Sequence, residues 1–286
     1  MAATAMEMLS EPLSLLLLLT ALVIEVLAPV LHYHQFGEAV RTARDAGFSA
    51  LFTCGIAFAV FPTIRVFRRE METGTYEMAL AHPVSRCGFF LAKSFGAFLA
   101  FVLFSVTVFS VALVMFKGAA VGGEIASKTG TIVRVYGPFF VFGVGAIILP
   151  LAISAALNRF FRCRFVLSSF LICAVFSLCG GVASGVMLGE VACKLLPASL
   201  LVSCPAAVVL FSAAAFSVRL KTNAAASAAL LILAFSLPAM DNYYRVESLA
   251  RGGSLPCLEV VSAVLFALPA VAAFLLFGIY FSLRRE

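Results

Sequence analysis

The sequence predicts an all-α protein that crosses a membrane many times. Of the 286 residues, 63% are hydrophobic and 12% are charged, whereas a soluble domain usually carries about a quarter charged residues. The mean hydropathy is +1.10, and long apolar runs recur along the chain. These observations exclude a soluble globule, a disordered chain and a disulfide scaffold, so we expect a single transmembrane domain over residues 1–286.

Apolar runs of sufficient length predict about eight transmembrane helices, because a helix needs about 20 such residues to cross the hydrocarbon core. The first run follows Glu7 and Glu11 rather than basic residues, so we interpret it as a lasting span and not as a cleaved signal peptide. The sixth and seventh runs would also fit a re-entrant pair. Arg219 and Lys221 lie between them, however, and a cation near mid-bilayer costs about 2.5–3.5 kcal/mol. The expected spans lie near residues 13–31, 47–64, 95–116, 135–157, 165–189, 195–218, 224–240 and 258–283.

Basic residues predict the orientation, since Lys and Arg are enriched in cytoplasmic loops. They are densest in Arg65–Lys93, Asn158–Arg164 and Arg219–Lys221, and they recur at the carboxyl end. We therefore expect these segments and both termini on the cytoplasmic side of the cell (inner or plasma) membrane. The basic residues form short clusters between apolar runs, so membrane lipid is the expected surrounding and no nucleic acid is expected as a partner. The segments expected outside are 32–46, 117–134 and 241–257.

The longest cytoplasmic segment, residues 65–93, is polar and patterned. Arg65–Thr73 is expected to extend the second span as a helix, and Gly74 can adopt the left-handed conformation that ends a helix. Thr75 is suited to cap a short helix over Tyr76–Ala81, which Pro83 then ends. Ser85 is expected to cap a further segment that leads into the third span, and Lys93 to extend back to the lipid headgroups.

The same segment carries a motif with a distinctive spacing. It consists of Glu70, Glu72, Thr73, Gly74, Thr75, Glu77, Leu80, Pro83, Val84, Ser85 and Arg86, followed by Lys93. This pattern resembles the cytoplasmic signature between the second and third spans of type-two ATP-binding-cassette (ABC) exporter permeases. Members of that family usually have six spans and commonly begin with a basic amphipathic helix, whereas Met1–Pro12 carries no Lys or Arg.

The resemblance implies that the chain is the permease subunit of an ABC exporter, without catalytic activity of its own. The short helix of the loop would be a coupling helix that docks in a groove on a separate ATPase subunit and passes its movement to the spans. Acidic residues of the loop would pair with cations on the ATPase, and apolar residues would anchor the contact. The implied ATPase-coupling residues are Glu70, Glu72, Gly74, Thr75, Glu77, Met78, Leu80, Pro83 and Arg86.

The resemblance also implies the partners. Two permease subunits, identical or different, would work with two ATPase subunits, and ATP and Mg²⁺ would bind to the ATPase, so this chain is expected to bind no cofactor. Residues 122–129 come nearest to a phosphate-binding loop, but Ser127 stands where that motif requires Gly. The sequence does not indicate the transported substrate.

An ion-gradient-driven secondary transporter or channel is the alternative function. That class usually contains several buried ionisable residues or paired broken helices, and Glu25 is the one acid well inside an expected span. Glu25 would line a substrate path, hydrogen-bond a neighbouring helix as a neutral acid, or extend to the outer interface. The hypothesis of an intramembrane enzyme has still less support, because the chain has no H-E-x-x-H motif and no acid pair inside an expected span. No catalytic residue is therefore expected.

Small residues recur at every fourth position in the fifth expected span, as they do where helix backbones approach closely in membranes. This stripe would pack against a neighbouring span or form a dimer seam. Its members are Ser177, Gly181, Gly185 and Gly189.

Two further groups of residues near the expected outer face have the residue types of a metal site and of a disulfide. His32 and His34 with Glu38 have the donor types of a zinc or copper site, but polar residues are expected at the end of a span, so no metal site is expected. Cys193 and Cys257 would form a disulfide if their helices were adjacent, which the sequence leaves open.

Overall fold

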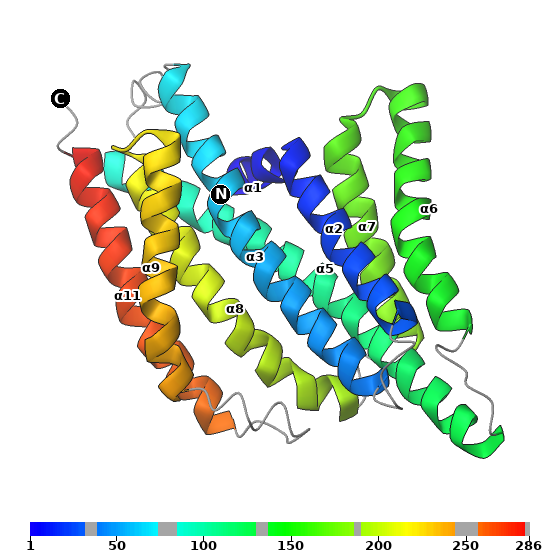
Figure 1. The fold of residues 1–286 in the computed structure, drawn as a ribbon. Helices are drawn as coiled ribbons and strands as arrows, with labels where there is room; N and C mark the ends of the chain where they lie inside the picture. Colours follow the sequence, from blue (N-terminus) through cyan, green and yellow to red (C-terminus); the bar gives the residue numbers. More distant parts are fainter. Residues whose placement is uncertain (32–38, 74–84, 130–136, 186–189, 244–256, 284–286) are drawn as a thin grey trace. The chain divides into compact units, whose positions relative to one another are not determined.

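Every regular element in the described part of the chain is a helix (Figure 1). The computed structural model describes residues 1–31, 39–73, 85–129, 137–185, 190–243 and 257–283. The all-α prediction is therefore confirmed. The helices are α1 (Ala2–Leu9), α2 (Pro12–Leu31), α3 (Ala39–Glu72), α5 (Arg86–Thr129), α6 (Gly137–Phe161), α7 (Phe165–Ala183), α8 (Glu190–Ser217), α9 (Thr222–Tyr243) and α11 (Cys257–Leu283).

Seven helices within the described ranges are long and apolar enough to cross a membrane, namely α2, α3, α5, α6, α7, α8 and α11. Together they account for all the expected spans except the one near 224–240, and they confirm a multi-pass membrane protein. That remaining span coincides with α9, whose 22 residues would extend about 33 Å. The part of α9 with described side chains, Thr222–Leu233, is apolar but shorter than a crossing. The eighth crossing stays a prediction.

Two helices extend well beyond the hydrocarbon core. The 34 residues of α3 end at Glu72, which confirms the helical extension expected over Arg65–Thr73. The 44 residues of α5 would extend about 66 Å, about twice the thickness of the core. Residues 117–129, which we expect on the outer side, belong to this helix and do not form an irregular loop. Their side of the membrane stays a prediction. The helix can continue here because no proline occurs between Pro83 and Pro138.

The amino-terminal helix α1 was not expected from the sequence. Ala5, Met8 and Leu9 are its buried residues. The Ser14 hydroxyl donates a hydrogen bond to the Met8 carbonyl over 2.6 Å, which fixes the bend between α1 and α2. At Gly96 of α5 an added Cβ would lie 2.5 Å from the Met1 carbonyl oxygen, so α1 crosses α5 where a side chain is missing.

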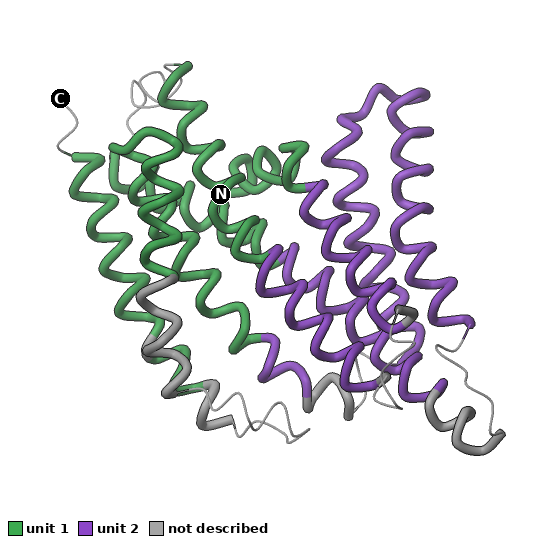
Figure 2. Tube along the Cα trace, viewed as in Figure 1, with its two compact units in different colours: residues 1–14, 55–102, 200–286 green, residues 15–54, 103–199 purple. Residues whose placement is uncertain are grey.

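The described chain divides into two compact units (Figure 2). Unit 1 comprises residues 1–14, 55–102 and 200–286, and unit 2 comprises residues 15–54 and 103–199. The helices α2, α3, α5 and α8 therefore contribute residues to both units. In unit 1, the Phe211 ring of α8 lies 5.6 Å from that of Phe98 on α5, and Phe216 of α8 contacts Phe277 of α11 at 5.8 Å.

In unit 2, α6 and α7 form an antiparallel pair joined by a tight turn, in which Arg162 has a φ of 54°. The rings of Phe142 and Phe176 stack at a centroid distance of 5.5 Å. Phe142 also covers Gly180, where an added Cβ would lie 1.9 Å from a ring carbon. A glycine is therefore required at position 180 for this close packing.

The stripe of small residues is shorter than expected. Ser177 and Gly181 are buried on α7, whereas the helix ends at Ala183 and Gly185 follows with a φ of 65°. A glycine in this left-handed conformation is a common helix stop. Gly189 lies outside the described residues. The burial of Ser177 and Gly181 agrees with packing against neighbouring helices of unit 2.

Candidate functional site

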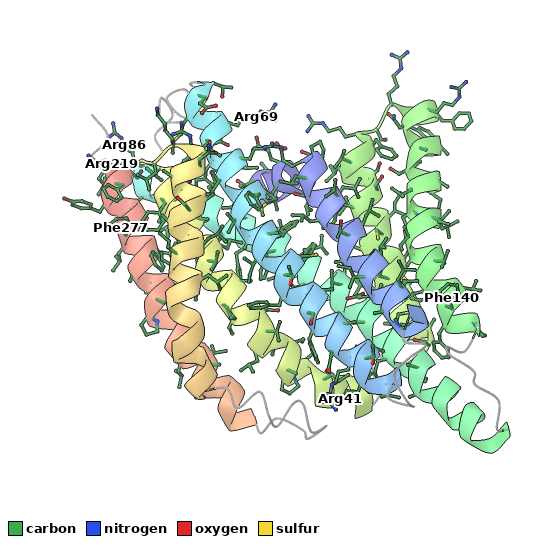
Figure 3. The ribbon with its side chains drawn as sticks, in the orientation of Figure 1. Arg41, Arg69, Arg86, Phe140, Arg219 and Phe277 are labelled. Atoms are coloured by element: carbon green, nitrogen blue, oxygen red, sulfur yellow. The ribbon has the colours of Figure 1, made fainter. Side chains whose placement is uncertain are left out.

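The motif-bearing segment is framed by the end of α3 and the start of α5. Glu70 and Glu72 belong to α3, and Arg86 is the first residue of α5. Figure 3 shows Arg69, Arg86 and Arg219 at the same end of unit 1. The remaining expected coupling residues, Gly74, Thr75, Glu77, Met78, Leu80 and Pro83, lie outside the described residues.

Local hydrogen bonds fix where α3 ends and where α5 begins. At the end of α3, the amide and the hydroxyl of Thr73 both donate to the Arg69 carbonyl, over 2.9 and 2.8 Å. At the start of α5, the Ser85 hydroxyl accepts the Gly88 amide at 3.1 Å, which is the N-cap expected from the sequence. Ser85 caps α5 itself, so the segment after it is continuous with the third span.

An ion pair joins α3 and α5 close to the motif-bearing segment. The Lys93 ammonium group of α5 pairs with the Glu70 carboxylate of α3. The same ammonium group donates to the Val66 carbonyl over 3.2 Å and lies 4.8 Å from the centre of the Phe67 ring. The side chains of Lys93 and Glu70 are 4% and 21% exposed. Three different interactions therefore hold the Lys93 side chain against α3.

The position of Lys93 corrects one expectation. The sequence suggested that this side chain extends to the lipid headgroups, but it is buried between α3 and α5. The reason is that Glu70 lies within reach and satisfies the charge locally, so the long side chain need not extend to water. Glu70, expected to face an ATPase, is likewise engaged inside the chain.

The turn between α8 and α9 meets the same end of α3. The Arg68 guanidinium donates to the Leu220 carbonyl over 3.3 Å and pairs with Glu72 at 3.1 Å. The Arg219 guanidinium lies 5.1 Å from the centre of the Phe281 ring of α11. The Glu72 side chain is 64% exposed, so its pairing with Arg68 is a surface contact worth about 0–1 kcal/mol.

Two acidic residues, one in α1 and one in the bend between α1 and α2, lie near these charged side chains. The Glu11 carboxylate lies 3.6 Å from Arg65 and 3.8 Å from Arg69, and its side chain is 10% exposed. Burial raises the pKa of Glu7, and the nearby Lys93 opposes this rise. We call Glu7, Glu11, Arg65, Arg69, Glu70 and Lys93 the ionic cluster; three acids and three bases balance its charge. Sequence reasoning missed it because the contacts join separate helices, although acids at positions 7 and 11 were a usable signal.

Glu25 lies apart from this cluster, inside α2. The residue is 2% exposed, and neither carboxylate oxygen has a hydrogen-bond partner among the described residues. It is therefore buried within the protein and does not extend to the outer interface. The described residues supply no hydrogen bond from a neighbouring helix, and the role in a substrate path stays a prediction.

The other outer-face predictions remain untested. His32, His34 and Glu38 lie outside the described residues, and the side chains of Cys193 and Cys257 are not described. Among the described residues, no group of three His, Cys, Asp or Glu side chains could hold a metal ion.

Comparison with known sequences bears on more than half of the chain. The sequence model of a family described as ABC-2 family transporter protein matches residues 10–180. This stretch runs from the start of α2 into α7, and it contains the motif-bearing segment and most of the ionic cluster. No curated protein and no solved structure gives a significant match.

Proposed function

The chain belongs to the ABC-2 family of transporter proteins, and from this premise we propose that it is a permease that exports its substrate with energy from ATP hydrolysed on a separate ATPase subunit. ATP and Mg²⁺ would bind to the ATPase. Two permease subunits, identical or different, would work with two ATPase subunits.

The observation that carries the proposal is the Glu70–Lys93 ion pair beside the motif-bearing segment. An ATPase that displaces the segment 74–84 must act on the ends of α3 and α5, because this segment joins them. With Lys93 held by Glu70, Val66 and Phe67, the two helix ends would move as one body. Both helices contribute residues to each of the two units.

The exposed charges suggest which residues meet the ATPase. Glu70 has its partner in Lys93, so we assign it a positioning role. Glu72 and Arg86 are exposed at the ends of α3 and α5. With Glu77, Met78 and Leu80 of the intervening segment, they would form the contact.

The proposed orientation places this end of unit 1 in the cytoplasm of the cell membrane. Arg69, Arg86 and Arg219 gather there (Figure 3), and clustered basic residues favour the cytoplasmic side. Both termini would lie on that side too. The ion-gradient-driven alternative gains less support, because Glu25 is the one acid in the middle of a described span.

A capture experiment tests the proposal. The affinity-tagged full chain is purified from its own host in mild detergent, and a co-purifying ATPase is identified from peptides that contain a Walker A motif. Glu72→Lys, Gly74→Pro and Glu77→Lys should each lower its recovery about tenfold, the effect of losing about 1.4 kcal/mol at an interface.

Asp45→Lys is the matched control, since Asp45 is a half-exposed acid on the opposite end of α3. It should leave the recovery unchanged. Recovery that is equal for the wild type and all three variants would contradict the docking site, and the absence of an ATPase from the wild-type eluate would contradict ATP coupling.

A further inference from the structure

Glu25 is a buried acid that the described fold does not use. It lies in the second half of α2, a helix whose other residues from Pro12 to Leu31 are uncharged. Its carboxyl group is removed from solvent, and neither oxygen has a partner among the described residues. Buried polar groups are normally hydrogen-bonded, so an exception points to a group that pairs only at another stage of the protein's work.

The backbone at this position is also short of a partner. Pro29 follows four residues after Glu25 inside α2. Because proline has no N–H, the Glu25 carbonyl loses the donor that a regular helix would supply. Glu25 thus brings two acceptor groups, one carboxyl and one carbonyl, to the same level of the span.

The surroundings of Glu25 are apolar. The adjacent Val26 packs against Gly143 of α6, where an added Cβ would lie 2.8 Å from a Val26 methyl carbon. The buried Cys54 thiol of α3 interacts electrostatically with Glu25. The arginines of the same unit at the start of α3, Arg41 and Arg44, lie near Asp45. Among the described groups none supplies a counter-charge for an ionised carboxylate here, so we expect the carboxyl group to keep its proton at rest.

We propose that Glu25 is the binding point for a substrate that carries a protonated amine on an apolar body. On binding, the carboxyl group releases its proton to water, and the carboxylate pairs with the ammonium group, so one positive charge replaces another and the buried charge stays balanced. The Glu25 carbonyl accepts a second hydrogen bond where the amine has a second N–H. The role in transport rests on the proposed function, whereas binding itself does not.

Two other ligand classes fit less well. A divalent metal prefers four to six ligands. The described residues contain no group of three His, Cys, Asp or Glu side chains that could hold one. A neutral apolar substrate would leave the carboxyl group as unpaired as it is now. A cation with N–H donors satisfies both acceptors with the groups present.

Carbodiimide labelling tests the proposal on the purified full chain in phosphatidylcholine nanodiscs, without ATPase or ATP. Dicyclohexylcarbodiimide adds to a protonated carboxyl group in apolar surroundings, the acyl group then migrates to nitrogen, and no atom leaves. Peptide mass mapping should locate this adduct on Glu25. N,N-dimethyldecylamine, a tertiary amine that cannot form an amide, is the cationic probe, and N,N-dimethyldecanamide is the neutral control of similar shape.

At an amine concentration about ten times its Kd, about a tenth of the sites stay free, so the labelling rate should fall roughly tenfold. The neutral amide should leave the rate unchanged. Glu25→Gln should lose the adduct, and Glu25→Asp should keep it. If Glu25→Gln fails to fold, the protection of the wild type decides alone.

The absence of an adduct on Glu25, or equal protection by the amine and the amide, would overturn the inference. Failure of the ATPase capture would contradict the coupling mechanism and leave this result intact, so the two proposals fail separately.

Discussion

Glu70 of α3 and Lys93 of α5 form a largely buried ion pair, with side chains 21% and 4% exposed. The pair lies two residues before the end of α3 and seven residues after the start of α5. A buried pair adds little net stability, but loss of one member is costly because the other charge is left without its partner. The pair therefore fixes how the two helix ends sit against each other.

Replacement of Lys93 should test this cost. Lys93→Met removes the cation that pairs with the partly hydrated Glu70 carboxylate, so we expect a loss of about 2 kcal/mol in the free energy of unfolding. The double variant Glu70→Gln/Lys93→Met should recover about half of it. SDS titration in mixed micelles, followed by far-ultraviolet circular dichroism, measures both.

Arg41→Met is the control for that series, because Arg41 pairs at 3.8 Å with a half-exposed Asp45. Its effect should stay below about 0.5 kcal/mol. A double variant no more stable than Lys93→Met alone would show that the lysine acts through packing rather than through Glu70.

The close approach of α1 to α5 at Gly96 gives a second prediction. In Gly96→Leu the new side chain would meet the Met1 carbonyl and Thr4, so α1 should be displaced from α5. A cysteine at the buried position 5 (Ala5→Cys), in a background without the native cysteines, should then react with maleimide about tenfold faster.

Gly137→Leu is the matched control, since an added Cβ at Gly137 meets nothing within 4 Å. It should leave the reaction rate at position 5 unchanged. Equal rates in all three proteins would show that α1 does not depend on the contact at Gly96.

Much of this fold could be predicted because the bilayer constrains it strongly. Hydropathy located the helices, and local rules located the end of α3 near Thr73 and the cap at Ser85, because caps depend on residues close in sequence. The length of α5 was underestimated because hydropathy marks the membrane and not the helix end, and nothing after Phe116 breaks the helix before Thr129.

The candidate site could be predicted only in part. The motif identified the segment and Glu70, but the partner of Lys93 depends on how α3 and α5 pack, which no local pattern specifies. Glu11 appeared only as an acid before the first span, whereas the structure places it against Arg65 and Arg69. Long-range ion pairs of this kind need the tertiary structure.

A pH dependence should arise from Glu7. Burial raises its pKa above the ordinary value of 4.5, so between these two values the folded chain holds a proton that the unfolded chain releases. The free energy of unfolding therefore falls as the pH rises through that window. Glu7→Gln should unfold at a higher temperature than the wild type at pH 7, and the difference should shrink at about pH 3.5.

Glu72→Gln serves as the control for this effect, because the Glu72 side chain is 64% exposed. The difference in unfolding temperature between Glu72→Gln and the wild type should not show the same change between about pH 3.5 and pH 7. A Glu7→Gln protein less stable than the wild type at pH 7 would indicate that attraction to Lys93 outweighs the cost of burial.

The small residues of α7 give a prediction about packing. Gly181→Leu places a large side chain at a buried position, so we expect a loss of about 1–3 kcal/mol in the free energy of unfolding. The mass measured by light scattering should stay the same. Val175→Leu, at a position 59% exposed on the same helix, is the control and should change neither quantity. Dissociation of a dimer without loss of stability would instead identify a dimer seam.

The turn between α8 and α9 provides a test of topology. The Arg68 guanidinium holds the Leu220 carbonyl at 3.3 Å, so Lys221 lies near the end of α3 that carries Arg69. In a background without native cysteines, Lys221→Cys and Arg69→Cys should react with an impermeant maleimide from the cytoplasmic side, and Arg41→Cys from the outside. Ser127→Cys should react from the same side as Arg41→Cys. Reaction of Lys221→Cys from the outside would contradict the proposed orientation, because basic residues at this end would then face away from the cytoplasm. Reaction of Lys221→Cys and Ser127→Cys from the same side would contradict the count of eight spans.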